Sequence, residues 1–110
     1  MRTLRFIVRG QSATRDPKCD FDNLVPGSDG YLDLEVAFDK TWDKCVSIVA
    51  GFFDSLGHEY TPQIISNGRC KIPADVLKNR VVKVQFYGRC EGKTIVTNKV
   101  EFHQNGGKNE

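Results

Sequence analysis

Apolar and polar residues alternate along several stretches of this chain. The clearest alternation is YLDLEVAFD at 31–39, whose apolar positions are Leu32, Leu34, Val36 and Phe38. A helix would scatter these residues around its circumference, so the pattern predicts a strand with one buried face. The stretches TLRFIVRG at 3–10 and RVVKVQFYG at 80–88 alternate in the same way and predict two further strands.

The most apolar stretch is TWDKCVSIVAGFF at 41–53. Its part from 45 to 53 is β-branched and apolar on both sides, which is typical of a central strand or one covered on both faces. One face would hold Val46, Ile48, Ala50 and Phe52, and the other would hold Cys45, Val49 and Phe53. We expect Trp42 to plug the core at a sheet corner. Whether Phe53 meets the protein's own loop or a neighbouring protein is open at this point.

The remaining segments contain turn signals and one helical candidate. Residues 16–30 are rich in Asp, Pro and Gly and predict a long loop. We expect Phe21, Leu24 and Val25 to anchor this loop on the core. Asn67-Gly68 predicts a type I′ hairpin turn, and TIVTNKVEFH at 94–103 predicts a last strand.

The elements together indicate an all-β fold. About seven short strands, with turn signals between them, predict an antiparallel immunoglobulin-like β-sandwich. Pro73 and Asp75 suit the start of one short helix near residues 73–78. We expect a single domain over residues 1–103 and a flexible Gly-rich C-terminal tail over residues 104–110.

Composition and charge limit the classes of partner that we expect this chain to bind. The 110 residues are 39% hydrophobic and 27% charged, with a net charge of +2, which is a normal balance for a globular domain. The basic residues are dispersed rather than clustered, so we expect no nucleic-acid partner. No apolar run reaches the roughly 18 residues of a membrane span, so we expect no membrane partner. MRTLRFIVRG is unlike a signal peptide, which predicts synthesis in a reducing cytosol.

Four cysteines, at positions 19, 45, 70 and 90, contain no C-x-x-C pair. In a reducing compartment the default prediction is four free thiols. A disulfide is the alternative, and Cys19 with Cys45 is the first pair to check.

The candidate chemical motifs are weak. GRCEGKT at 88–94 has three residues between its glycines, whereas a P-loop needs four and leads into a helix, so a hairpin turn is expected. His58 and His103 lack the spacing of metal ligands. We therefore expect no enzyme, no catalytic residue, no metal and no cofactor.

Aromatic residues offer two interpretations. Trp42, Phe52, Phe53, Tyr60 and Tyr87 could line a glycan-binding face, because aromatic rings stack on sugars. In the other interpretation Trp42 and at least one of Phe52 and Phe53 belong to the core. Phe53, Tyr60 and Tyr87 are the candidate interface residues, and exposed strand edges offer a further route to assembly.

Three segments carry a family resemblance. They are DPKCDFDNLVPGSDGYLDLEVAFDKTWDKCV at 16–46, KIPADVL at 71–77 and TNKVEFHQNGG at 97–107. In order and spacing they resemble small proteins of phages and prophages of Gram-positive bacteria. They also resemble the N-terminal β-sandwich domain of baseplate upper proteins. The resemblance spans nearly all of residues 1–107 and transfers no ligand-binding residue.

The resemblance implies a phage virion structural protein that acts by docking, as a capsid decoration protein or a tail or baseplate adaptor. Its expected partners are other virion proteins, and a homo-oligomer is expected. Baseplate proteins continue beyond this domain whereas the present sequence stops at Glu110, which favours a stand-alone decoration or adaptor protein. A glycan-binding module for host attachment and an inhibitor of a host defence protein are the alternatives.

Overall fold

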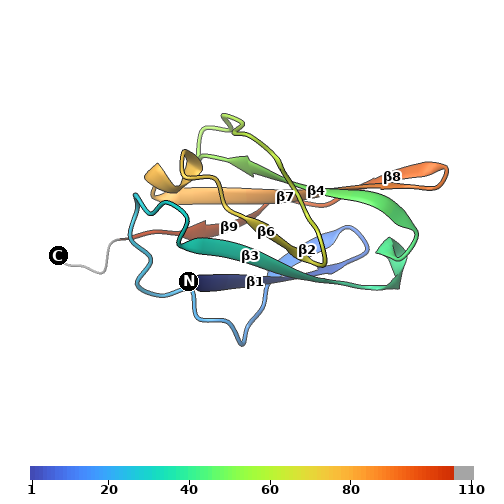
Figure 1. Cartoon of the computed structure of the whole chain (residues 1–110), viewed down its shortest axis with the longest axis horizontal. Helices are drawn as coiled ribbons and strands as arrows, with labels where there is room; N and C mark the ends of the chain where they lie inside the picture. The colour runs from blue at the N-terminus through green and yellow to red at the C-terminus, as the bar shows by residue number, and fades with distance from the viewer. Residues whose placement is uncertain (106–110) are drawn as a thin grey trace.

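Two β-sheets face each other across a shared core (Figure 1). The computed structural model describes residues 1–105, and within them nine strands form these sheets. The strands are β1 (Arg2–Arg9), β2 (Ser12–Arg15), β3 (Leu32–Phe38), β4 (Cys45–Phe53), β5 (Gln63–Ile64), β6 (Arg69–Lys71), β7 (Val81–Cys90), β8 (Lys93–Val96) and β9 (Val100–His103). The predicted all-β class is confirmed.

Sheet A has the strand order β2-β1-β3-β6. Its central strands β1 and β3 are parallel, with Arg2 opposite Leu32, so the prediction of a purely antiparallel fold is wrong here. The 16–31 segment makes this possible because it carries the chain back past the start of β1. The Arg2 guanidinium fixes that return by donating to the carbonyl oxygens of Asp20 and Asp22 at 3.0 and 2.7 Å.

Sheet B has the order β5-β4-β7-β8, and β9 also pairs with β7. The single strand predicted over 94–103 is therefore two strands, which pair with successive parts of β7. Thr97 lies in the interruption between β8 and β9. Its hydroxyl accepts a hydrogen bond from the Phe86 N–H at 3.1 Å, so this backbone group of β7 has a partner there. Figure 1 shows the β7–β8 hairpin reaching beyond the other strands at one end of the molecule.

Asn98, in this interruption, joins the two sheets. Its amide nitrogen donates to the Ala13 carbonyl at 3.1 Å, and its amide oxygen accepts from the Ala13 N–H at 2.7 Å. The side chain thus imitates the peptide group of a neighbouring strand. Gln11 donates to the Val96 carbonyl at 3.0 Å beside it, so the β2 edge of sheet A is tied to sheet B.

The core consists of the apolar residues that alternate inward from both sheets. Phe6 of sheet A lies 6.2 Å from Phe86 and 6.3 Å from Phe102 of sheet B, measured between ring centroids. The inward faces predicted for 31–39 and 80–88 are confirmed. The fully buried side chains include Leu4, Phe6, Val8, Leu34, Phe52, Val82, Val84, Phe86 and Phe102.

Trp42 ends the short 3-10 helix η1 (Lys40–Trp42) and closes the core at the corner between β3 and β4. Its side chain is 2% exposed, and its indole N–H donates to the Gly10 carbonyl at 2.8 Å. Gly88 makes room for the ring, because a Cβ there would lie 2.5 Å from Cζ3 of Trp42. The predicted core plug is confirmed.

The faces predicted for β4 hold only in part. A register shift between Cys45 and Ser47 leaves Val46 at a bulge, where it is 81% exposed. Val46 therefore does not share the buried face of Ala50 and Phe52, and Cys45 packs against the core instead. A bulge adds one residue to a strand, so the inward and outward positions before the bulge are out of step with those after it.

The 16–31 loop is anchored by two of its three predicted residues. Leu24 is buried, and the Phe21 ring meets the Phe6 ring edge-on at 5.5 Å. Val25 is 55% exposed, so its predicted anchoring role is wrong. Leu24 points into the core, and the side chain of the next residue points out to solvent.

The predicted hairpin turn at Asn67-Gly68 is present, but the predicted helix is shorter than expected. Asn67 and Gly68 both have positive φ angles, of 54° and 75°, as a type I′ turn requires. The helix expected near 73–78 is only the 3-10 turn η2 (Val76–Lys78).

The flexible tail predicted for residues 104–110 begins at Gln104, but the side chain of this residue is fully buried and donates to the carbonyls of Leu77 and Asn79. The domain therefore extends past the predicted boundary at residue 103. Residues 106–110 of the expected tail lie outside the described residues.

Candidate interaction surface

The outer face of sheet B carries a row of apolar side chains that crosses the sheet. Strand register places Val49 beside Ile64 on one side and Tyr87 on the other, and Tyr87 beside Val96. Ile64 is 74% exposed, and the other three side chains are half-buried. We call Ile64, Val49, Tyr87 and Val96 the apolar row. It borders a shallow hollow to which Ser47, Arg89 and Thr94 contribute.

Tyr87 is the polar member of this row. Its hydroxyl donates to the Gln85 side-chain oxygen at 2.7 Å. Partial burial raises the pKa of the Tyr87 hydroxyl, and the negative charge of Glu59 raises it further, so the group remains a protonated donor. Gly51 lies under the ring, because a Cβ there would be 2.8 Å from Cε2 of Tyr87.

Phe53 lies on the same outer face as Tyr87 but is only 6% exposed. The Lys99 ammonium lies over its ring, 4.0 Å from the centroid, as a cation–π contact. The protein's own chain therefore covers Phe53, which answers the question that the sequence left open. As an interface residue Phe53 can support the apolar row, but it offers little surface of its own.

Tyr60, the third residue predicted for the interface, is not part of this face. It packs against the core, and its hydroxyl donates to the Asp54 carboxylate at 3.2 Å and accepts from the Asn79 amide at 3.1 Å. The structure brings Phe53 and Tyr87 together and places Tyr60 elsewhere.

The aromatic residues proposed for sugar stacking are mostly internal. Trp42 and Phe52 are core residues, as the core interpretation predicts. Of the five aromatic residues considered, Tyr87 alone combines an outward orientation with partial exposure.

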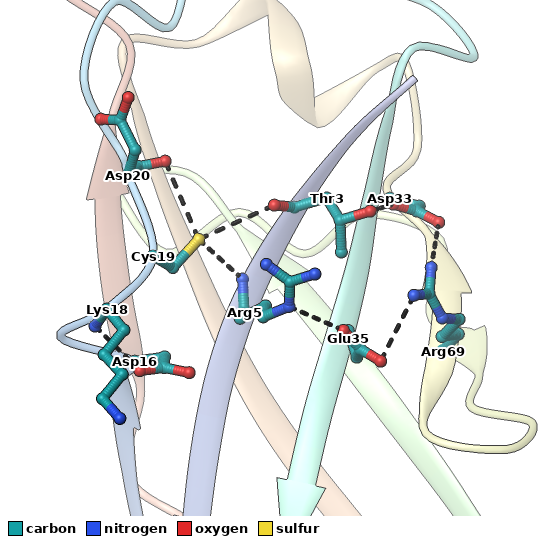
Figure 2. A network of polar contacts seen from close by, with 9 residues as sticks. All are labelled: Thr3, Arg5, Asp16, Lys18, Cys19, Asp20, Asp33, Glu35 and Arg69. Carbon is teal, nitrogen blue, oxygen red and sulfur yellow. Dashed lines mark hydrogen bonds and ion pairs between the residues drawn. The ribbon is translucent and has the colours of Figure 1, made fainter.

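The outer face of sheet A is different because its charges pair with each other (Figure 2). Arg69 bridges Asp33 and Glu35 with both distances at 3.3 Å, and Arg5 contacts Glu35 at 2.9 Å. Such exposed pairs contribute only about 0–1 kcal/mol each, but a paired charged face is well solvated. The contrast identifies the outer face of sheet B as the better candidate for docking.

The cysteines depart from both sequence predictions. Cys45 and Cys90 form a disulfide between β4 and β7, while Cys19 and Cys70 are free. Four free thiols and a Cys19–Cys45 bond are therefore both contradicted. Cys19 instead holds the 16–31 loop on β1, where its sulfur accepts a hydrogen bond from the Arg5 N–H at 3.3 Å (Figure 2).

Cys70 faces inward from β6. Burial raises the pKa of its thiol to about 12, with a further contribution from the negative charge of Asp33. It is therefore an unreactive, protonated thiol at neutral pH.

The histidines each contact one carboxylate. His58 Nδ1 lies 3.0 Å from Asp54, and His103 Nε2 lies 2.7 Å from Glu101. Within residues 1–105, no three His, Cys, Asp or Glu side chains gather as metal ligands would. No helix in this described part of the chain is long and apolar enough to cross a membrane. The segment 88–94 forms the β7–β8 hairpin turn, as expected.

Sequence reasoning missed Ile64, Val49 and Val96 as members of a surface. Each belongs to a different strand, and only the register of four strands places them side by side. The one signal in the sequence was that each is an apolar residue in a predicted strand or hairpin.

Comparisons with protein-family models, curated proteins and solved structures found no match to this chain. The resemblance to phage proteins therefore stays a prediction.

Proposed function

We propose that this chain is a non-enzymatic structural protein of a phage virion, acting through protein–protein docking as a capsid decoration protein or a tail or baseplate adaptor. The observation that carries the docking role is the apolar row on the outer face of sheet B. The phage assignment rests on the resemblance of segments 16–46, 71–77 and 97–107.

The apolar row has the features of a contact site. It crosses neighbouring strands, so its side chains present one continuous surface rather than scattered contacts. Fully burying a side chain such as that of Ile64 contributes about 1.5–3 kcal/mol. A partner that covered the row would also gain an aromatic anchor in Tyr87, a residue type enriched among binding hot spots.

The proposal includes an immunoglobulin-like arrangement of the two sheets. A buried Trp beside a disulfide supports it, since both features occur in that fold. One difference is that the Cys45–Cys90 bond joins neighbouring strands of sheet B, whereas in antibody domains it joins the two sheets.

The test is to purify phage particles from cells that carry the gene and to analyse them by mass spectrometry. We expect the chain in the particles at a fixed ratio to the other virion proteins. Ile64→Lys should reduce its incorporation at least tenfold, because a lysine cannot be buried at an apolar contact without a partner.

Val25→Lys is the matched control, because Val25 is also an exposed β-branched residue but lies in the 16–31 loop. It should leave incorporation unchanged. Recovery of the wild-type chain from infected-cell lysate alone, never from purified particles, would contradict the proposal. Sedimentation equilibrium of the same proteins tests self-association, which Ile64→Lys should weaken if the copies meet at the row.

A further inference from the structure

The Cys45–Cys90 disulfide lies at the end of sheet B where β4 begins and β7 ends. The two cysteines occupy opposed positions of antiparallel strands, and the strand pairing continues from there to Phe53 opposite Lys83. The disulfide thus joins two strands that backbone hydrogen bonds already hold together. Its cleavage leaves the two strands held by their remaining hydrogen bonds.

A hollow gives solvent access to this bond. It has a volume of about 540 Å³ and lies between the η1 turn and the β7–β8 hairpin. Cys90 lines it together with Lys40, Thr41, Asp43, Lys44, Glu91 and Lys93. Cys90 is a core residue that is 6% exposed, and Cys45 packs against the core half-buried, so the disulfide lies at the edge of the core.

The charges around the hollow favour an anionic reactant. Three lysines and two acidic residues line it, which leaves an excess of one positive charge among the residues next to the bond. Positive charge raises the local concentration of anions, and it stabilises the thiolates that form when a disulfide is cleaved.

We propose that Cys45–Cys90 is a thiol–disulfide exchange site for small anionic thiols of the glutathione class, guided by Lys40, Lys44 and Lys93. A thiolate attacks Sγ of Cys90, a mixed disulfide forms, and the electron pair of the broken bond goes to Sγ of Cys45, which takes a proton from water. A second thiolate then attacks the glutathione sulfur of the mixed disulfide. It releases Cys90 as a thiolate and glutathione disulfide, so two thiols are oxidised as one protein disulfide is reduced.

Trp42 is a built-in reporter of this reaction. A Cβ at Gly88 would lie 2.5 Å from Trp42 Cζ3 and 3.1 Å from Cys45 Sγ, so the indole and the disulfide lie against the same glycine. A disulfide quenches the emission of a neighbouring indole. Trp42 is the single Trp of the chain, so a rise in emission reports cleavage.

The experiment treats the full, air-oxidised chain with reduced glutathione or with β-mercaptoethanol, which carries no charged group besides its thiolate, and follows Trp42 emission. Three proteins are compared: the wild type, the hollow variant K40E/K44E/K93E, and the control K18E/K71E/K78E, whose three lysines are exposed elsewhere. At low salt the hollow variant should react with glutathione about tenfold more slowly than the wild type, and the control should not change. Reduction by β-mercaptoethanol, whose thiolate carries less negative charge than that of glutathione, should be slowed clearly less in the hollow variant and should not change in the control.

Alkylation in denaturant, followed by mass spectrometry, provides an independent readout. Two of the four cysteines should be modified before the reaction and all four after it. An acid-quenched sample should carry glutathione on the Cys90 peptide.

Equal glutathione rates in the wild type and the hollow variant would overturn the guiding role of the lysines. Four modified cysteines in the air-oxidised chain, or cleavage no faster than global unfolding, would overturn the exchange site itself. Circular dichroism verifies that each variant is folded.

Discussion

At the scale of single residues, Asp54 organises the turn that follows β4. Its carboxylate accepts hydrogen bonds from the backbone N–H groups of Leu56 and His58 at 2.9 and 3.0 Å. It also accepts from the Tyr60 hydroxyl. Burial raises the pKa of Asp54, but these hydrogen bonds, with that of the His58 ring, lower it more, so the pKa lies below its ordinary value.

This pKa shift predicts an acid-dependent stability. The folded pKa of Asp54 lies below the unfolded value of about 3.9, so its contribution is complete above that pH and is lost as the pH falls through the folded pKa. Asp54→Asn should therefore unfold at lower urea than the wild type at pH 7, and the gap should narrow below about pH 4. Urea midpoints measured across this pH range test the prediction.

Asp29→Asn is the control, because Asp29 is an exposed carboxylate of the 16–31 loop. Its midpoint should follow the wild type at every pH. A gap for Asp54→Asn that stays constant from pH 7 down to pH 2 would show that ionisation of the carboxyl plays no part.

At the scale of elements, two glycines allow large rings to lie flat on sheet B. A Cβ at Gly88 would meet the Trp42 ring, and a Cβ at Gly51 would meet the Tyr87 ring. Trp42 is buried and held by its hydrogen bond to the Gly10 carbonyl, whereas Tyr87 is half-buried on the outer face and can rotate toward solvent once its hydroxyl bond to Gln85 breaks. The same substitution should therefore have unequal effects at the two positions.

We predict that Gly88→Ala lowers the free energy of unfolding by about 1–3 kcal/mol, as overpacking does in other cores. Gly51→Ala should cost clearly less, since the tyrosine can rotate away. Chemical denaturation followed by circular dichroism measures both. Replacing glycine by alanine removes the same entropy from the unfolded chain at both positions, so this effect cancels in the comparison. Equal losses of unfolding free energy for Gly88→Ala and Gly51→Ala would therefore mean that the Trp42 contact is not rigid.

Most elements were predictable from the sequence because alternation is a local signal. Leu34 and Val84 could be assigned to buried faces from their neighbours alone. The bulge at Val46 could not, since the extra residue in β4 is defined only by its register with β7. The parallel pairing of β1 with β3 was equally hidden, because it depends on how the 16–31 loop returns the chain.

The candidate surface was less predictable than the fold. Tyr87 could be proposed as an exposed aromatic, but nothing local distinguished it from Tyr60, whose hydroxyl is used by Asp54 and Asn79. The disulfide was missed for a similar reason. Cys45 and Cys90 are 45 residues apart in the sequence and meet only through the pairing of β4 with β7.

At the scale of the whole molecule, Asn98 links the β2 edge of sheet A to sheet B. We predict that Asn98→Ala lowers the free energy of unfolding by about 1–3 kcal/mol, because the N–H and C=O of Ala13 both lose their partner. Urea unfolding of purified protein measures this loss.

Asn105→Ala provides the comparison, since Asn105 is exposed near the end of the same strand region, and its loss should be negligible. Hydrogen exchange locates the effect. The Ala13 amide should exchange faster in Asn98→Ala, while amides in the centre of β7 keep their protection relative to global stability. An unchanged Ala13 exchange rate would mean that contacts other than those of Asn98 hold the β2 edge to sheet B.

The division of strands between the sheets also has a consequence for the nascent chain on the ribosome. Three strands of sheet A come from the first 38 residues, but the aromatic rings that cover them, Phe86 and Phe102, are translated last. The apolar face around Phe6 therefore lacks the cover of these two rings through most of translation. A ribosome stalled before β7 would hold a chain prone to aggregation, and chaperone demand should be greatest in that interval.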